Sequence, residues 1–313
     1  GYVDADEIDW ESIGIACIIE SVIWTKTRIS CSLSSTDTFS PPQKERIINI
    51  EEKRMSDIVL ECKSLSKTFP LSAKQRKERK VSSTSLIAVD DLDLSIRAGE
   101  IFGLLGPNGA GKTTTLRMLS SLISPTSGEV LYRGENINSH ISDYRKKVSF
   151  LTSELKLDDF FTPEFTFDYF AALYEVEPEE AKRRKTELFH HFGIDSFANS
   201  QIKNLSTGMR QKASLAISLC HDPEIIIFDE PTNGLDIIAS REVEDFLLSL
   251  KKEGKAIIIS THILEEVDAV CTRAIVIADG EIKADGTPAQ LKAMDPSGRL
   301  DVVFRNLTKG GAQ

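Results

Sequence analysis

Gly106-Pro107-Asn108-Gly109-Ala110-Gly111-Lys112-Thr113 fits the phosphate-binding pattern G-x-x-x-x-G-K-[ST] at every fixed position. The apolar run 101–105 before it predicts a buried strand. Residues 114–123 after it predict a helix with Leu116, Leu119 and Leu122 on one face. Backbone N–H groups of such a loop and the helix dipole attract phosphate, Lys112 can reach the outer phosphates, and the Thr113 hydroxyl can bind Mg²⁺. The stretch therefore predicts a nucleoside triphosphate site that extends to Thr114; a chance glycine-rich turn is the alternative.

Composition narrows the class of protein. The 313 residues are 41% hydrophobic and 27% charged, as in a soluble globular protein of one or two domains. The net charge of −10 argues against a nucleic-acid-binding surface, so we expect no nucleic-acid partner. One basic stretch, residues 74–80, predicts a solvated loop, with contact to anionic lipid or to a partner as the alternative.

The cysteines and the apolar runs indicate where the protein works. The five cysteines show no metal-binding spacing, which favours a reducing, cytoplasmic compartment. The longest apolar run, residues 13–24, is too short to cross a bilayer and contains Glu20. Residues 1–12 hold acids and no base, unlike a secretory signal.

The first 54 residues differ from the rest of the chain. They lack a clear period and contain a Ser/Thr-rich patch, whereas a well-patterned domain begins at Met55 and runs to about residue 308, before a short tail at 309–313. The codons of Glu51-Glu52-Lys53-Arg54 can consist entirely of purines, so this stretch before Met55 resembles a translated ribosome-binding site. We therefore hypothesise that residues 1–54 are upstream sequence read in frame; a genuine accessory helix with a linker is the alternative.

Within the domain, strands alternate with helices. Residues 163–222 predict helices, whereas residues 274–284 predict a hairpin with a turn at Asp279-Gly280. Other expected strands are 58–62, 92–96, 129–132, 148–151, 225–228 and 256–259. This order predicts an α/β fold with a mostly parallel sheet, an antiparallel β part and an inserted helical subdomain at about residues 155–222.

Polar residues follow two of the apolar strands. Asp229 and Glu230 come directly after the run 225–228, where Asp229 can hold Mg²⁺ with Thr113 and Glu230 can activate water. His262 follows the run 256–259, and we expect it to contact the γ-phosphate. An ordinary exposed turn and a structural histidine are the alternatives.

A second anion site is predicted in the segment Leu205-Ser206-Thr207-Gly208-Met209-Arg210-Gln211. Ser206 is a good N-cap for the helix that follows, and Gly208 lies just inside that helix. A plain capped helix is the alternative.

Together these motifs resemble, in order and approximate spacing, an ATP-binding subunit of an ABC transporter over residues 57 to about 308. The resemblance implies a P-loop NTPase core that hydrolyses MgATP with Lys112, Glu230 and His262 as catalytic groups. It also implies a head-to-tail homodimer that closes ATP between the phosphate loop (residues 106–113) of one copy and the signature segment (residues 205–211) of the other. Phe69 matches the aromatic residue that stacks on adenine, with a core phenylalanine as the alternative, and Asp236 matches the loop that crosses the dimer interface.

The partner and place of action follow from the same resemblance. It implies a separately encoded membrane permease and a peripheral position on the cytoplasmic face of the membrane. Family members carry glutamine where this chain has Ser153, which weakens the expectation of a metal contact there, and glycine is commoner at the position of Thr207. With residues 150–153 and the basic insertion, these features are most similar to the sodium-extrusion (Nat-type) branch.

Six aromatic residues crowd residues 160–170. We expect several to be core and others to line the groove that receives a helix of the membrane partner. They are Phe160, Phe161, Phe165, Phe167, Tyr169 and Phe170. Two other functions remain open at this stage: a soluble ABC ATPase that acts on nucleic acid or ribosomes, and a regulatory subunit that binds ATP without effective hydrolysis.

Overall fold

The computed structural model describes residues 57–79, 82–152 and 157–308. The predictions for residues 1–54, for Ser153 and for the tail at 309–313 lie outside these residues. Within the described part, no helix is both long and apolar enough to cross a membrane.

The central sheet has six strands in the order β10-β9-β3-β8-β7-β6. Strands β6 (Val148–Thr152), β7 (Ile225–Asp229), β8 (Ala256–Thr261), β3 (Ile101–Leu105) and β9 (Arg273–Ala278) run parallel. Strand β10 (Glu281–Gly286) closes the edge as an antiparallel hairpin with β9. The carboxyl ends of β3, β7 and β8 therefore meet at one edge of the sheet.

A second, antiparallel sheet has the order β2-β1-β4-β5. Its strands are β1 (Ile58–Pro70), β2 (Ser85–Arg97), β4 (Ser127–Tyr132) and β5 (Glu135–Asn136). Strands β1 and β2 are longer than the predicted 58–62 and 92–96. Register shifts along their pairing break the alternation by which a strand is recognised in the sequence.

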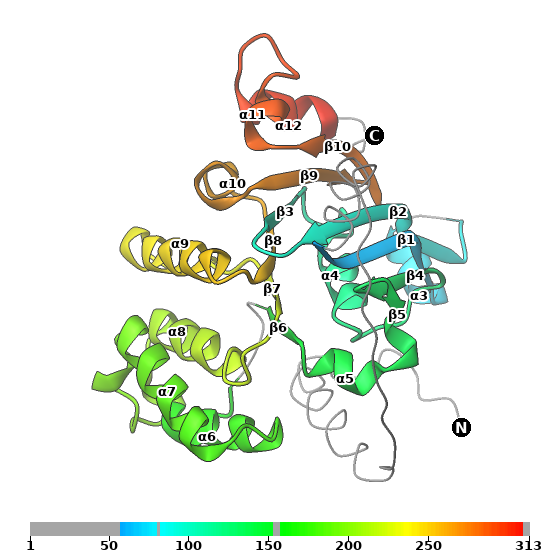
Figure 1. Cartoon of the computed structure of the whole chain (residues 1–313). Coiled ribbons are helices and arrows are strands. Elements are labelled where there is room, and N and C mark those ends of the chain that lie inside the picture. Colours follow the sequence, from blue (N-terminus) through cyan, green and yellow to red (C-terminus); the bar gives the residue numbers. More distant parts are fainter. Residues whose placement is uncertain (1–56, 80–81, 153–156, 309–313) are drawn as a thin grey trace, which may run out of the picture.

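Helices cover both faces of the central sheet (Figure 1). Helix α4 (Lys112–Leu119) lies between the two sheets, whereas α9 (Ile237–Lys252) and α10 (Leu264–Val270) pack on the opposite face. Helices α6 (Pro163–Leu173), α7 (Pro178–Phe192) and α8 (Thr207–Ser218) form a helical block beside that face. The other α-helices of the described residues are α3 (Ala73–Arg79), α5 (Ile141–Arg145), α11 (Pro288–Lys292) and α12 (Leu300–Thr308).

The apolar strands bury both of their faces. Ile225 and Ile227 of β7 contribute to the core around α4, whereas Ile226 and Phe228 contribute to the core under α9 and the helical block. Continuous rather than alternating hydrophobicity is what a sheet covered on both sides requires. This packing confirms the predicted α/β fold with a mostly parallel sheet.

Two local predictions were wrong. The helix after the phosphate loop ends at Leu119 rather than residue 123, because Ser121 adopts a left-handed backbone with φ of 62°. The basic stretch predicted as a loop contains helix α3, since Lys, Arg, Gln and Glu all favour helix.

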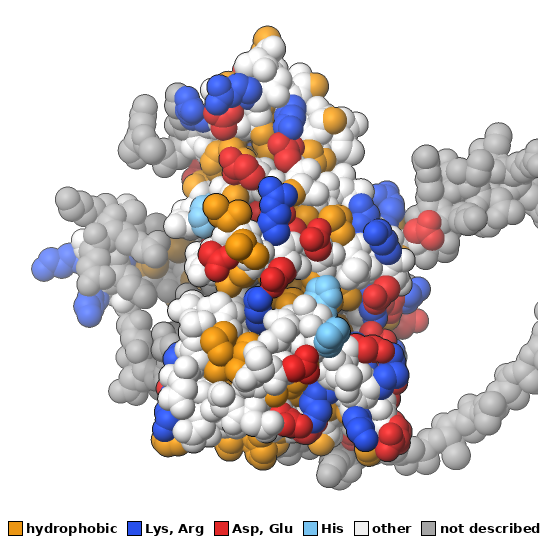
Figure 2. All heavy atoms as spheres, turned by 90° about the vertical axis from the view of Figure 1, so that its left-hand side faces the viewer, with side chains coloured by type: hydrophobic (Ala, Val, Ile, Leu, Met, Phe, Trp, Pro, Cys, Tyr) orange, Lys and Arg blue, Asp and Glu red, His pale blue; other side chains and the backbone are white. Residues whose placement is uncertain are grey.

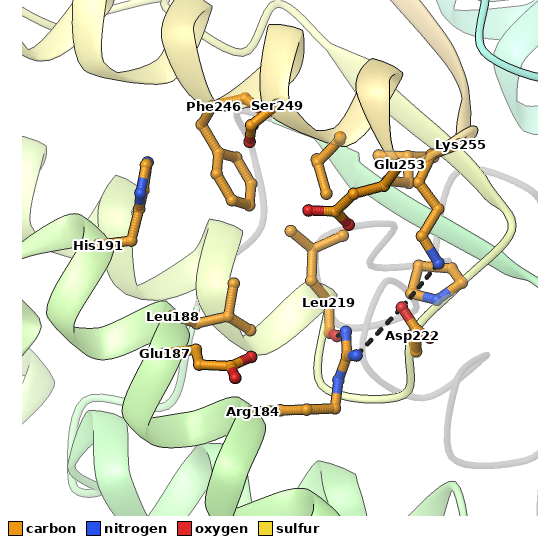
Figure 3. A pocket seen from close by; sticks show the side chains of 13 residues that line it. Arg184, Glu187, Leu188, His191, Leu219, Asp222, Phe246, Ser249, Glu253 and Lys255 are labelled. Carbon is orange, nitrogen blue, oxygen red and sulfur yellow. Dashed lines mark hydrogen bonds and ion pairs between the residues drawn. The ribbon is translucent and has the colours of Figure 1, made fainter.

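An ionic cluster joins the helical block to the central sheet. Arg184 of α7 and Lys255 before β8 both contact Asp222, which follows α8, at 3.1 Å and 2.6 Å (Figure 3). A cavity of about 190 Å³ lies beside them between α7 and α9. The outer face over these helices carries acidic, basic and hydrophobic side chains in small mixed groups (Figure 2).

Candidate active site

The phosphate loop joins β3 to α4 and leaves no room for side chains at two glycines. A Cβ atom on Gly106 would lie 2.4 Å from the carbonyl oxygen of Ile277, and one on Gly111 would lie 2.4 Å from that of Ala88. Gly111 also has φ of 103°, which favours glycine. The first N–H groups of α4 have no helical acceptor, so they are free to bind an anion.

Lys112 lies at the base of this loop with 5% of its surface exposed. Its Nζ donates to the carbonyl oxygens of Gly106, at 2.7 Å, and Pro107, at 3.2 Å. Burial lowers the pKa of Lys112, and the nearby carboxylates of Glu230 and Asp229 oppose that shift. The ammonium group is thus held beside the loop, within reach of the space where phosphates would lie.

Asp229 ends β7 and connects this strand to helix α4 and to strand β8. Its Oδ2 accepts a hydrogen bond from the Thr113 hydroxyl at 2.8 Å, and its Oδ1 accepts one from the Ser260 hydroxyl. The pairing of Thr113 with Asp229 was predicted from the sequence, whereas Ser260 was missed. The sequence shows only that Ser260 directly follows an apolar run, and the strand register is what places it opposite Asp229.

Glu230 and His262, which the sequence assigns separately to the nucleotide site, lie in contact with each other. Glu230 Oε1 lies 3.0 Å from His262 Nδ1, and Glu230 Oε2 accepts from Asn233 Nδ2 at 3.1 Å. Glu230 is half-buried and His262 is exposed at the carboxyl edge of the sheet. This carboxylate can accept a proton from water, and the imidazole can orient it.

Phe69 lies near the end of β1 and is half-buried. It pairs with Leu86 of β2. Two residues further along β2 is Ala88, whose carbonyl oxygen leaves no room for a side chain at Gly111. The Lys67 ammonium lies 5.2 Å from the Phe69 ring centre. The ring is therefore on the part of the antiparallel sheet that approaches the phosphate loop.

The signature segment lies at the start of α8. Ser206 is the N-cap of this helix, and its hydroxyl accepts from the Met209 N–H at 3.2 Å. Within the described residues, no hydrogen bond or ion pair joins Ser206 or Gly208 to the phosphate loop. One polar link does join this segment to the turn after Asp229, because Gln211 Nε2 donates to the Pro231 carbonyl oxygen at 3.1 Å.

Asp236 has a structural role that was not predicted from the sequence. It is the N-cap of α9, and its Oδ1 accepts from the N–H groups of Ile238 and Ala239, both at 2.9 Å. The two residues after it, Ile237 and Ile238, are exposed at the surface. The expected contact of Asp236 with nucleotide stays a prediction.

The oxygen atoms of Thr113 and Asp229 suit a hard divalent cation. A hydroxyl and a carboxylate that already contact each other are the ligand types that Mg²⁺ takes beside nucleotide phosphates. The donor set therefore fits the metal that the sequence predicts.

Comparison with known proteins agrees with this geometry. A family model described as ABC transporter matches residues 89–233. The ABC transporter ATP-binding protein NatA of Bacillus subtilis is 40% identical over 218 residues, which cover 69% of this chain and 89% of that protein. The chain belongs to the family of ABC transporter ATP-binding proteins. As a member, it is an ATP-binding subunit and an ABC-type ATPase.

Two further relatives extend the comparison. The Nod factor export ATP-binding protein I of Cupriavidus metallidurans is 38% identical over 69% of this chain and 71% of its own length. A dimeric structure of the ATP-binding cassette MJ0796 with ADP and Pi matches with a TM-score of 0.64 and 25% identity, over 73% of this chain and 98% of that one. These relatives do not favour a soluble ATPase that acts on nucleic acid or ribosomes, nor a subunit without effective hydrolysis.

Proposed function

We propose that this chain powers an exporter as one of two identical ATPase subunits bound to a separate membrane permease. Residues 55–308 would form the ATPase domain, with its helical subdomain at about 155–222. The observation that carries the proposal is the contact between Thr113 and Asp229, with Glu230 and His262 beside it. Together these groups form one half of a site for MgATP.

Each side chain has a distinct task in this half-site. Lys112 neutralises phosphate charge, Thr113 and Asp229 would hold Mg²⁺, and the metal would offset charge on the phosphate oxygens. Glu230 positions or deprotonates water, and His262 contacts the γ-phosphate. Phe69 would stack on the adenine. Catalysis of this kind rests on position and electrostatics, so hydrolysis is slow until the site closes.

The other half of the site would come from a second copy of the chain. Ser206 and Gly208 lie at a helix N-terminus, which attracts phosphate, yet in the described part of the chain they make no hydrogen bond to their own phosphate loop. A head-to-tail pair would place them, with Asp236 nearby, against the ATP of the neighbour. The relative MJ0796 is described as a dimer, which supports this arrangement.

An exposed aromatic row that begins just before α6 and continues along that helix would receive the permease. Phe161, Phe165 and Tyr169 follow one another at intervals of four residues, with stacked rings whose centres are 4.6 Å and 6.3 Å apart. They are 43–50% exposed, and Phe160 is 75% exposed, whereas Phe167 is buried. Such a row is a suitable surface for a short helix.

The peripheral position on the cytoplasmic face follows from binding to that permease. Export as the direction is supported by the relative named for Nod factor export. Sodium is our proposed substrate class, supported by the likeness to NatA and by the Nat-type sequence features.

The membrane partner can be tested on α6. Phe165→Ser removes the central ring of the row, so we expect membrane association of the chain to fall about tenfold, while ATP hydrolysis by the purified chain changes by less than about twofold. Sedimentation of the chain with native membranes measures the first effect. A wild-type chain that does not sediment with membranes would contradict the proposal. Tyr174→Phe, which changes a side chain packed against the core at the end of α6, is the control.

A further inference from the structure

The turn after Asp229 holds Glu230 in an uncommon backbone conformation. Glu230 has φ of 55°, in the left-handed region that costs a non-glycine residue free energy. Its N–H donates to the Ser260 carbonyl oxygen at 3.1 Å, and the Asn233 N–H donates to the Glu230 carbonyl oxygen at 3.1 Å. Such a conformation persists only where neighbouring groups hold it.

One of those neighbours is a buried carboxylate on α10. Glu266 is 4% exposed and Thr232, in the turn, is 6% exposed. The Thr232 hydroxyl donates to Glu266 Oε1. Within the described residues, Glu266 Oε2 has no hydrogen-bond partner and the carboxylate has no ion-pair partner. Burying a carboxylate without a cation is unfavourable for folding. A role for the hydrogen bond between Glu266 and Thr232 would explain why the carboxylate is buried here.

The segment that contains α10 contacts the turn at two places. His262, just before the helix, lies 3.0 Å from Glu230 Oε1, and Glu266, four residues later, binds Thr232. On the other side of the turn, Gln211 of α8 donates to the Pro231 carbonyl oxygen. The turn is thus held between α10 on one side and α8 on the other.

We propose that Glu266 is a positioning residue for ATP hydrolysis: through the Thr232 hydroxyl it fixes the turn that aims Glu230. This inference rests on the proposed role of Glu230. Loss of the hydroxyl bond frees the turn to leave its left-handed conformation, which moves the Glu230 carboxylate. Among the residues that the structure describes, neither Glu266 nor Thr232 has a hydrogen bond or ion pair to the phosphate loop, so ATP binding does not depend on them.

The central test is Thr232→Val in the full-length chain, which removes the hydroxyl and nearly keeps the volume. We expect kcat for MgATP hydrolysis to fall by about tenfold to about a hundredfold, because small displacements of a catalytic group have effects of this size. KM for ATP should change by less than about twofold. Thr232→Ser keeps the hydroxyl, and its kcat should stay within about threefold of wild type.

Thr166→Val is the matched control. Thr166 is also 6% exposed and its hydroxyl also makes one hydrogen bond, to the Thr162 carbonyl oxygen, but it lies on α6. Thr166→Val should leave kcat within about twofold of the wild-type value. Similar losses of kcat in Thr166→Val and Thr232→Val would show a general effect of buried hydroxyls and would overturn the inference.

The Glu266 side is tested by Glu266→Gln and Glu266→Leu. The amide of Gln can still accept from Thr232, so it should retain kcat within about threefold, whereas Leu should match Thr232→Val. Because both changes break one contact, the double variant Thr232→Val/Glu266→Leu should be no slower than either single variant by more than about twofold. If Glu266→Leu does not fold, the Thr232 pair still decides the question.

Two outcomes separate the inference from the proposed function. An unchanged kcat in Thr232→Val, beside wild-type hydrolysis and a loss of hydrolysis in Glu230→Gln, contradicts the positioning role alone. A rise in KM for ATP with kcat unchanged also contradicts it, because that pattern indicates a loss of nucleotide binding. A wild-type chain that does not hydrolyse MgATP contradicts both.

Discussion

The phosphate loop and the signature segment both lie at the start of a helix, but they differ in what they contact within the chain. The loop before α4 meets Asp229 through Thr113 and holds Lys112 by its own carbonyl oxygens. At the start of α8 the Ser206 hydroxyl accepts from the Met209 N–H and so caps the helix. Within the described residues, neither Ser206 nor Met209 has a hydrogen bond to the phosphate loop. The first region is thus linked to the acid at the end of β7 within the same chain, whereas for the second we propose that its donors meet the ATP of a second copy.

The largest expected effect is on hydrolysis at the complete half-site. In Glu230→Gln we expect turnover to fall by about 10²–10⁴-fold, because a group that accepts a proton from water is lost. ATP binding should persist, since the phosphate loop is unchanged, and the ATP-bound dimer should accumulate. ATPase assays and light scattering with MgATP measure the two effects. Glu253→Gln, at the end of α9, is the control, and wild-type turnover in Glu230→Gln would remove Glu230 from its role.

Mixed dimers test whether the two regions belong to different copies. Lys112→Ala and Ser206→Arg should each lose activity alone. In an equal mixture, half of the dimers carry one of each, and each such dimer has one intact site, so activity should recover to about a quarter of wild type. Assays over a series of mixing ratios measure the recovery.

The control mixture combines Lys112→Ala with Glu230→Gln. Both changes lie in the same half-site, so every mixed dimer keeps a defect in both of its sites and no activity should return. Absence of recovery in the first mixture, with both variants folded and dimeric, would mean that each chain forms its site alone.

The smallest expected effect concerns the cap that the signature segment does make. Ser206→Ala removes the acceptor for the Met209 N–H and should lower the free energy of unfolding by about 1 kcal/mol. Ser206→Asn keeps a capping oxygen and should restore most of that stability. Urea unfolding of the three proteins measures the difference. Equal stability of all three would show that the cap contributes nothing, and that the Ser206 hydroxyl is available only for a ligand.

Much of the half-site was predictable because its parts are short and local. The run of glycines before Lys112 and the acids after β7 each come directly after an apolar strand, and the residues at the carboxyl ends of parallel strands lie along one edge of the sheet. On this basis Glu230 and His262 were each predicted to lie beside the nucleotide, whereas the contact between their side chains was not predicted. The fold class followed from the same alternation of strands and helices.

Other features depended on groups far apart in the sequence. Ser260 was missed because its role appears only when β8 is paired in register with β7. Glu266 was missed because nothing local distinguishes it from the other acids of α10, and its burial beside Thr232 results from how α10 packs. The end of α4 was misplaced because a left-handed serine leaves no mark in an apolar pattern.

The sequence by itself determined the class of this protein and most of its chemistry. Backbone donors in a glycine loop, a lysine, a hydroxyl and acids after apolar strands are properties of short segments, and they specify a nucleotide phosphate site wherever they occur together. The tertiary structure decided that Asp229 accepts hydrogen bonds from both Thr113 and Ser260, that the Thr232 hydroxyl meets the buried Glu266, and that Ser206, within the described residues, makes no hydrogen bond to the phosphate loop. The physical reason is that strand register and helix packing bring together groups from distant parts of the chain, and no local pattern encodes their distances.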